Sequence, residues 1–257
     1  MQAPDAFDPP VLEAQTVHLW WFLCGESEEF SASGPGPLDA RERERATRFR
    51  TPSLRRRFEH RRTVLRELLG AYLGVPAAGL CLTEGEHKKP LLGGEHAMDL
   101  RFNLSHTGAW VLVGVARGRE VGVDVETLER RGDFEGVARR VFTVGEREVL
   151  ERCGASAEDE WKRAFLRGWS RKEAFLKAYG TGLLREPRDL HVGLEERPQQ
   201  DAGGPWFPED GTLGSWGQLF DLDAPPRHRA AVAAEGAGWE VRVLRTWPEA
   251  EALGCAR

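Results

Sequence analysis

Two acidic side chains at alternating positions of an apolar segment are the first candidates for chemistry. Asp124 and Glu126 lie in a β-rich stretch, residues 121–126, so both carboxylates are expected on one face of a strand and the valines between them on the other. Adjacent carboxylates repel each other unless a cation lies between them, and oxygen-only ligands favour Mg²⁺ or Mn²⁺ over zinc. The pair predicts a divalent-metal site that binds a phosphate-bearing substrate; an exposed acidic strand face is the alternative interpretation.

A third carboxylate follows in residues 158–179, where the apolar spacing predicts a helix that Gly180 would end. Glu173 shares one side of this helix with Trp169 and other apolar side chains. A carboxylate on such a side is expected to be paired or bound to a metal, and it could also act as a general base. Lys177, one turn later, could neutralise a phosphate, although a plain Glu–Lys surface pair has the same spacing.

Ser105 and His106 close the segment Phe102-Asn-Leu-Ser-His106, where a strand is expected to end in a polar turn. Both side chains can donate hydrogen bonds to an anion, although a Ser-His pair by itself is usually structural. The chain contains no G-x-S-x-G elbow, no G-x-G-x-x-G pattern and no P-loop. The missing motifs argue against a serine hydrolase and against Rossmann or Walker nucleotide sites.

Basic residues are concentrated near the N-terminus. Residues 41–62 contain ten arginines and three glutamates, in a protein whose net charge is −5. An anion is therefore expected beside this segment, unless Glu–Arg pairs at helical spacing make it an ordinary solvated helix. The negative net charge counts against a protein devoted mainly to nucleic acid.

These candidate residues need helices and strands to position them. Apolar spacing predicts helical structure over 38–73, broken near Thr51-Pro52, with Leu54 on the core side of the second helix and Gly74 at its end. The other expected elements are helices over 134–140, 144–152 and 158–179, and strands near 79–83, 99–104, 110–116, 121–126, 189–194, 216–221, 229–234 and 239–246. Helices with a small, mostly antiparallel sheet in each half indicate an α+β fold.

Composition sets the class of protein. A chain of 257 residues, 40% hydrophobic and 30% charged, is typical of a folded globular protein. No apolar run approaches the roughly 20 residues of a membrane helix, and the N-terminus lacks the pattern of a signal peptide. The four cysteines are far apart without a C-x-x-C motif, which predicts neither a zinc site nor a disulfide framework. We therefore expect a cytoplasmic protein without a membrane partner.

Taken in order, three segments resemble the Sfp-type 4′-phosphopantetheinyl transferases, the family that activates carrier proteins of peptide and polyketide synthases. The segments are Phe102-Asn-Leu-Ser-His106, Val121-Gly-Val-Asp-Val-Glu126, and Trp169-Ser-Arg-Lys-Glu-Ala-Phe-Leu-Lys177 followed by Gly180-Thr-Gly-Leu183. Weaker support comes from Arg45-Ala-Thr-Arg-Phe49, Arg62-Thr63 and Lys89-Pro90. The resemblance implies two similar α/β subdomains in a pseudo-twofold arrangement, residues 1–118 and 119–257, with coenzyme A bound between them.

The resemblance also implies a role for each candidate residue. Asp124, Glu126 and Glu173 would hold Mg²⁺, or Mn²⁺, against the coenzyme A pyrophosphate, and Asp124 would count among the catalytic residues. Glu173 would deprotonate the carrier serine, and Lys177 would neutralise the α-phosphate and protonate the leaving 3′,5′-ADP. Ser105 and His106 would contact phosphates. The 3′-phosphate and adenine side of coenzyme A would be bound by Arg45, Arg62, Thr63 and Lys89.

The implied partners are coenzyme A and apo acyl, aryl or peptidyl carrier proteins, with no nucleic acid, and two halves in one chain make a monomer sufficient. Four features differ from the family pattern: Glu42 at a basic position, Lys88 in place of a glycine, Val125 between the two carboxylates, and the loop 196–214. Because Val125 supplies no side-chain ligand, a water would have to complete the metal shell. Two other functions stay open, a Mg²⁺-dependent nuclease and a non-catalytic carrier-protein binder.

Overall fold

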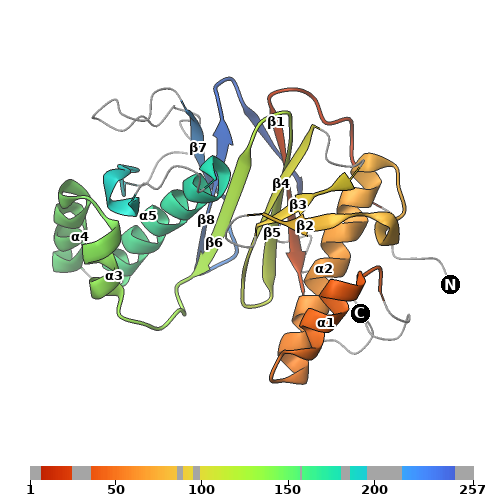
Figure 1. Cartoon of the computed structure of the whole chain (residues 1–257). Helices are drawn as coiled ribbons and strands as arrows, with labels where there is room; N and C mark the ends of the chain where they lie inside the picture. The colour runs from red at the N-terminus through yellow and green to blue at the C-terminus, as the bar shows by residue number, and fades with distance from the viewer. Residues whose placement is uncertain are drawn as a thin grey trace.

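The computed structural model describes residues 7–24, 36–85, 89–94, 99–156, 158–180, 186–195 and 216–246. Its helices are α1 (Ala40–Thr47), α2 (Pro52–Leu73), α3 (Phe134–Val141), α4 (Val144–Ser156) and α5 (Glu158–Tyr179), with 3₁₀ turns at Ala77–Gly79 and Pro187–Asp189. Its strands are β1 (Thr16–Leu23), β2 (Leu82–Glu84), β3 (Pro90–Leu92), β4 (Leu100–Thr107), β5 (Trp110–Arg117), β6 (Val121–Thr127), β7 (Gly217–Leu222), β8 (His228–Glu235) and β9 (Glu240–Arg245). This arrangement confirms the expected α+β fold (Figure 1). Within the described ranges, no helix combines the length and the apolar character needed to cross a membrane.

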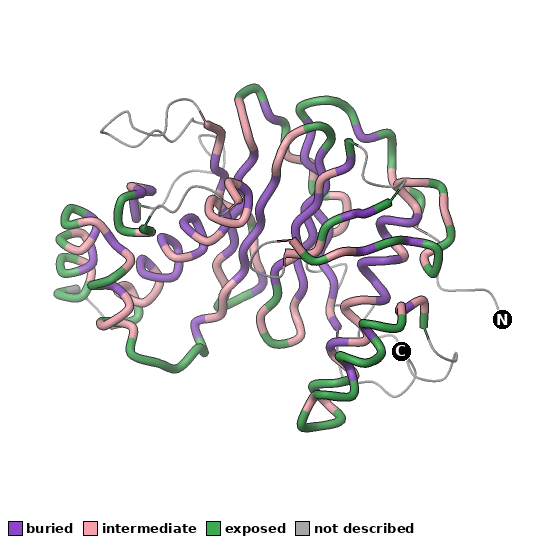
Figure 2. Tube along the Cα trace, in the orientation of Figure 1, coloured by how far each residue is buried: buried purple, intermediate pink, exposed green. Residues whose placement is uncertain are grey.

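Two sheets and two long helices form the layers of the molecule. One sheet has the strand order β4-β5-β1-β9 and the other has the order β6-β8-β7. Apolar side chains of both sheets, Val123 among them, share a core between the sheets, while α2 packs on the first sheet through Leu65 and α5 packs on the second through Ala174. The buried segments consequently run through the middle of the molecule (Figure 2). Each half is one small sheet covered by one 22-residue helix, as the pseudo-twofold expectation requires.

Strand β1 is central to its sheet, yet the sequence pattern does not predict it. Its sequence, Thr-Val-His-Leu-Trp-Trp-Phe-Leu, shows no polar and apolar alternation because both of its faces are covered. Trp20 and Phe22 face the core beneath α2, whereas Leu19 and Trp21 face the core between the sheets. A strand buried on both faces is a continuous apolar run, which periodicity alone does not distinguish from a buried helix.

The last described strand returns to the first half of the molecule. Strand β9 pairs in parallel with β1, with Val241 opposite Val17. The sheet of the first half therefore contains one strand from beyond residue 119. The division into 1–118 and 119–257 stays a prediction about the two subdomains, and β9 ties the end of the described chain to the first of them.

Local sequence signals explain where the long helices begin and end. The Thr51 hydroxyl accepts a hydrogen bond from the backbone N–H of Leu54 at 3.2 Å, and Pro52 occupies the first position of α2. Gly74 follows α2 with φ +66°, and Gly180 follows α5 with φ +70°, a conformation that glycine adopts without strain. Both glycines end their helices as the sequence predicts.

Two expectations about the elements are wrong. Leu54 is 45% exposed rather than in the core, because the first turn of α2 extends beyond the sheet (Figure 1). Residues 189–194 form no strand, and carbonyls of this segment accept hydrogen bonds from Arg171 and Lys172 of α5 instead of from a neighbouring strand. The loop 196–214, Lys88 and the motif residues 181–183 lie outside the described residues.

Candidate active site

A close contact between β6 and α5 brings the acidic and basic candidates together. A Cβ atom on Gly122 would lie 2.1 Å from the backbone oxygen of Ala174 and 2.4 Å from the backbone nitrogen of Ala178. Only glycine lets the strand and the helix approach this closely. Asp124 is the next residue on the same face of β6, so its side chain meets Lys177 of α5.

Asp124 is the most buried of the candidate carboxylates, with 3% of its surface exposed. Its Oδ1 atom accepts hydrogen bonds from Lys177 Nζ at 2.6 Å and from Ser105 Oγ at 3.0 Å. Its Oδ2 atom is buried and has no hydrogen-bond partner among the residues that the structure describes. Buried polar atoms are rarely left unpaired, so this oxygen marks a place where a further ligand is expected.

Glu126 and Glu173 are electrostatically coupled to Asp124. Burial, and then the negative charge of Asp124, raise the pKa of both glutamates above the ordinary value. Glu126 accepts a hydrogen bond from Trp169 Nε1 at 3.0 Å and one from Arg130, a residue that the sequence analysis did not single out. The charge of Asp124 therefore acts on both glutamates, one on the same strand and one on α5.

The donor set of these three carboxylates fits a hard divalent cation. Only oxygen atoms are offered, burial and then the charge of Asp124 raise the pKa of both glutamates, and one buried carboxylate oxygen of Asp124 has no hydrogen-bond partner in the described part of the chain. As the described side chains stand, no group of three His, Cys, Asp or Glu residues is close enough to hold a metal ion. Basic side chains lie against the carboxylates instead, with Lys177 on Asp124 and Arg130 on Glu126.

His106 extends from the end of β4 toward positive side chains. Burial, followed by the charges of Arg61 and Lys177, lowers the pKa of His106 to about 4. His106 is an exposed residue, and the charges of Arg61 and Lys177 act on its imidazole ring. Burial, and then neighbouring arginines that include Arg45, lower the pKa of Arg61. The sequence pattern did not single out Arg61, because it is one of many arginines in the basic segment 41–62.

The other residues predicted to bind coenzyme A occupy different places. Lys89 donates from Nζ to the backbone oxygen of Lys177 at 2.8 Å and pairs with Glu120 at 3.0 Å, so it joins the two halves beside the carboxylates. Arg45 pairs with Glu84 on the exposed surface. The remaining two, Arg62 and Thr63, lie on α2.

Glu42 is paired across the first two helices. It accepts hydrogen bonds from Arg62 and from the fully buried Arg66. Thr63, the neighbour of Arg62, is buried. Glu42, which stands where the family pattern has a basic residue, therefore pairs with Arg62. The resemblance assigns this same arginine to the 3′-phosphate.

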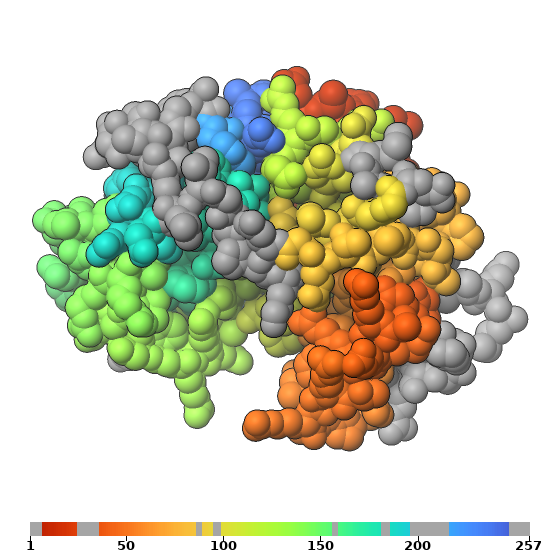
Figure 3. Space-filling view, viewed as in Figure 1, coloured from red at the N-terminus to blue at the C-terminus, as the bar shows by residue number. Residues whose placement is uncertain are grey.

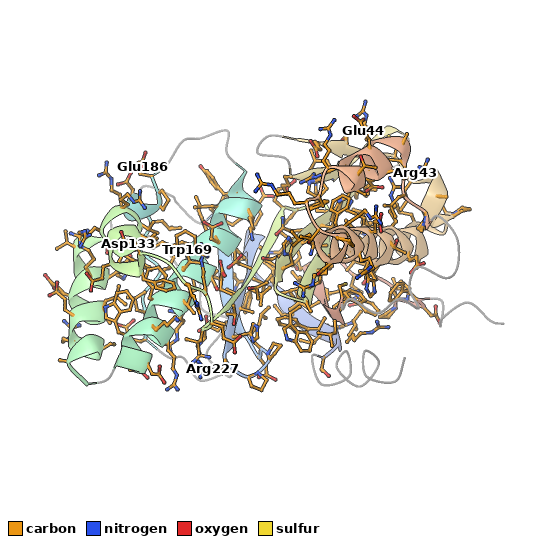
Figure 4. The ribbon with its side chains drawn as sticks, turned by 90° about the horizontal axis from the view of Figure 1, so that it is seen from below. Arg43, Glu44, Asp133, Trp169, Glu186 and Arg227 are labelled. Carbon is orange, nitrogen blue, oxygen red and sulfur yellow. The ribbon has the colours of Figure 1, made fainter. Side chains whose placement is uncertain are left out.

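The candidate residues belong to the zone between the two halves of the molecule. The space-filling view shows a hollow between the connection from β6 to α3 and the tips of α1 and α2 (Figure 3). Seen from below, Trp169 and Asp133 belong to one half, while Arg43 and Glu44 lie on α1 in the other (Figure 4).

Comparison with known proteins identifies the family. Residues 120–233 match the 4′-phosphopantetheinyl transferase superfamily, and residues 28–117 match the N-terminal region of 4′-phosphopantetheinyl transferases. The 4′-phosphopantetheinyl transferase HetI of Nostoc sp. is 35% identical over 236 residues, which cover 90% of this chain and 94% of that protein. A 4′-phosphopantetheinyl transferase of Bacillus subtilis is 31% identical over 157 residues, covering 54% of this chain and 66% of that protein.

A crystal structure of holo-[acyl-carrier-protein] synthase from Thermotoga maritima aligns with 46% of this chain and 64% of that chain, with 22% identity and a TM-score of 0.32, which is too low to bear on the site. The sequence relationships, by contrast, extend over both halves of the chain. The chain belongs to the 4′-phosphopantetheinyl transferase superfamily and is a transferase of this type.

Proposed function

We propose that this enzyme transfers the 4′-phosphopantetheine group of coenzyme A to a serine of an apo acyl, aryl or peptidyl carrier protein, releasing 3′,5′-ADP. The observation behind this proposal is a continuous set of basic side chains, three cations and the neutral imidazole of His106, that ends at the carboxylates. Electrostatic effects link Arg45 to Arg61, Arg61 to His106 and His106 to Lys177, and Lys177 pairs with Asp124. Coenzyme A has phosphates at two separated places, a 3′-phosphate and a diphosphate, and this set of charges complements both.

Asp124, Glu126 and Glu173 are the residues that would hold Mg²⁺ or Mn²⁺. Such an ion supplies charge neutralisation for the diphosphate in phosphoryl transfer. The unpartnered Oδ2 atom of Asp124 and the raised pKa values of the two glutamates support this assignment. Val125, between two of the ligands, faces the apolar core and leaves any further ligand position to solvent.

The remaining steps belong to residues of this chain. Glu173, whose pKa is raised by burial and by Asp124, accepts the proton of the carrier serine hydroxyl. The serine oxygen then forms a bond to the phosphorus that bears pantetheine, and the bond from that phosphorus to the oxygen of 3′,5′-ADP breaks. Lys177 donates hydrogen bonds at this end of α5, where its ammonium group neutralises the leaving phosphate.

Finer points of the proposal concern the setting of the reaction. Carrier proteins of polyketide or nonribosomal peptide synthases are the proposed acceptors, and the arginines of α1 and α2 would attract their acidic surfaces. We propose a cytoplasmic monomer, since the two halves of one chain already form both sides of the site.

Intact-mass measurement tests the reaction directly. Apo peptidyl, polyketide and fatty-acid carrier proteins are incubated with the enzyme, coenzyme A and Mg²⁺, and a gain of one phosphopantetheine group is expected on at least one of them. The gain should disappear with EDTA and in Glu173→Gln. It should persist in Glu151→Gln, which removes an exposed carboxylate from α4.

The rival functions give different results in the same experiment. A non-catalytic binder would form a complex with the carrier without any mass gain. A nuclease would instead degrade nucleic acid in a Mg²⁺-dependent way and bind it with a steep salt dependence. Absence of both mass gain and coenzyme A binding would refute the proposed transfer.

A further inference from the structure

The two sheets meet at β4 and β6 through side chains instead of a strand ladder. The backbone N–H of Val123 donates to Asn103 Oδ1 at 2.9 Å, and the backbone N–H of Val125 donates to Ser105 Oγ at 3.3 Å. Asn103 and Ser105 are two residues apart on β4, so they face β6 together. Their oxygens take the places that backbone carbonyls would occupy in a continuous sheet.

The hydroxyl group of Ser105 has no hydrogen-bonding capacity left. A serine hydroxyl offers one donor and two acceptor positions. Its hydrogen is donated to Asp124 Oδ1 at 3.0 Å, and its lone pairs accept from Val125 N–H and from Lys177 Nζ at 3.1 Å. Only 6% of Ser105 is exposed. A direct bond to a phosphate, the role that the family resemblance implies, would require one of these bonds to break.

These bonds determine which oxygen of Asp124 is available. Ser105 and Lys177 both bond to Oδ1, while Oδ2 is buried and without a partner. Rotation of the carboxylate would break both bonds to Oδ1. The hydroxyl group of Ser105 therefore holds the side chain of Asp124 in the orientation that leaves Oδ2 available to a cation.

We propose that Ser105 is a positioning residue that acts on the metal through Asp124 and does not bind coenzyme A phosphate. This inference rests on the proposed function, since it assigns Asp124 to the metal. The inference also gives the two residues of the Ser-His pair different roles. His106, at the exposed end of β4, keeps the role of contacting phosphate. The first half of the molecule thereby contributes a residue that organises the metal site of the second.

The test compares Ser105→Ala with Asn103→Ala. Each variant removes one side-chain acceptor from a β6 backbone N–H, but only Ser105 also touches Asp124. Mn²⁺ affinity is measured by electron paramagnetic resonance at saturating coenzyme A, and coenzyme A affinity is measured by calorimetry at saturating Mn²⁺. Wild-type transfer is first verified by intact mass, so a failure of the proposed function is detected separately.

Ser105→Ala is expected to weaken Mn²⁺ binding by about 10-fold or more, as is typical when a residue that orients a metal ligand is removed. Coenzyme A affinity at saturating Mn²⁺ should change by less than about 2-fold, because no phosphate contact is lost. Asn103→Ala should leave Mn²⁺ affinity within about 2-fold of wild type. Ser105→Thr keeps the hydroxyl group and should restore Mn²⁺ binding, and Ser105→Cys replaces Ser105→Ala if the latter does not fold.

Three results would overturn the inference. Weaker coenzyme A binding with unchanged Mn²⁺ affinity would assign Ser105 to a phosphate after all. An equal loss of Mn²⁺ affinity in Asn103→Ala would mean that Mn²⁺ binding depends on the contact between β4 and β6 in general. The hydroxyl group of Ser105 would then have no specific role. Unchanged Mn²⁺ affinity in Ser105→Ala, or in Ser105→Cys where that variant is used, would show that Asp124 needs no orienting partner.

Discussion

Lys172 lies next to Glu173 in sequence, yet the structure gives it a structural role. Its ammonium group pairs with Glu146 of α4 at 2.8 Å, and the side chains are only 1% and 0% exposed. The same ammonium donates to the backbone oxygen of Pro187 at 2.9 Å and to that of Leu190. Burial lowers the pKa of Lys172, and the charge of Glu146 opposes this effect. Lys172 therefore fastens α4 and residues 187–190 to α5.

Replacing Lys172 with methionine keeps most of the length of the unbranched side chain and removes its charge. Glu146 would retain hydrogen bonds from the backbone N–H groups of Thr143 at 2.9 Å and Val192 at 2.8 Å, but it would lose its counter-ion. Leaving one charge of a buried pair uncompensated costs about 3–5 kcal/mol. In a chain of this size, that loss corresponds to a fall of about 6–20 °C in the unfolding midpoint.

Thermal unfolding followed by circular dichroism measures this fall. Lys162→Met, on the same helix, is the matched control, because Lys162 lies over the ring of Phe134 at 5.0 Å without a buried ion pair. The control should lose no more than about 1 kcal/mol. The double variant with Glu146→Gln should recover part of the loss, since no buried charge then remains. A midpoint in Lys172→Met equal to that of the control would refute the reasoning.

Three further predictions concern the charges of the site. Lys177→Met should lower the rate of holo-carrier formation by about 100-fold, because it removes a cation beside the reacting phosphates; an unchanged rate in the mass assay would contradict its role. Arg130→Gln should strengthen Mn²⁺ binding by roughly 2- to 5-fold, because Arg130 competes for Glu126, whereas Arg131→Gln should not; equal effects would indicate only a change in net charge. The pKa of His106, followed by NMR titration, should lie well below 6.5, near about 4. Because this folded-state pKa is lowered, the neutral imidazole stabilises the fold above pH 6.5, and this contribution falls as the pH decreases from 6.5 toward 4; a normal pKa would contradict the environment described for it.

The local patterns of the sequence predicted much of the second half. Alternation along β6 placed Asp124 and Glu126 on one face and the valines in the core, and the structure has this arrangement. Helical spacing and the terminal glycine predicted α5 and its end, whereas the grouping of Glu173 and Lys177 with Asp124 was implied only by the family resemblance. These predictions succeeded because each depends on one element whose period is visible in the chain.

Features that depend on contacts between distant segments were not accessible from the sequence. The saturated hydroxyl of Ser105 requires β4, β6 and α5 to be placed together, and the pairing of Glu42 with Arg62 requires α1 to lie on α2. Arg61 could not be separated from nine other arginines in its segment, because only its position beside His106 distinguishes it. Tertiary contacts decide such roles, and local propensity has no information about them.

The balance of charge around the carboxylates gives the strongest physical reason to place a cation there. Three acidic side chains face two basic ones, Lys177 and Arg130, with neutral donors from Ser105 and Trp169. Burial, and then the charge of Asp124, raises the pKa of Glu126 and of Glu173, and among the described residues one buried carboxylate oxygen of Asp124 has no hydrogen-bond partner. Buried carboxylates with too few positive partners lower the stability of the folded protein unless a ligand binds to them. Such a group is therefore expected at a binding site. A divalent cation bound there, as proposed above, would compensate this excess charge and would allow Lys177 to turn toward a phosphate.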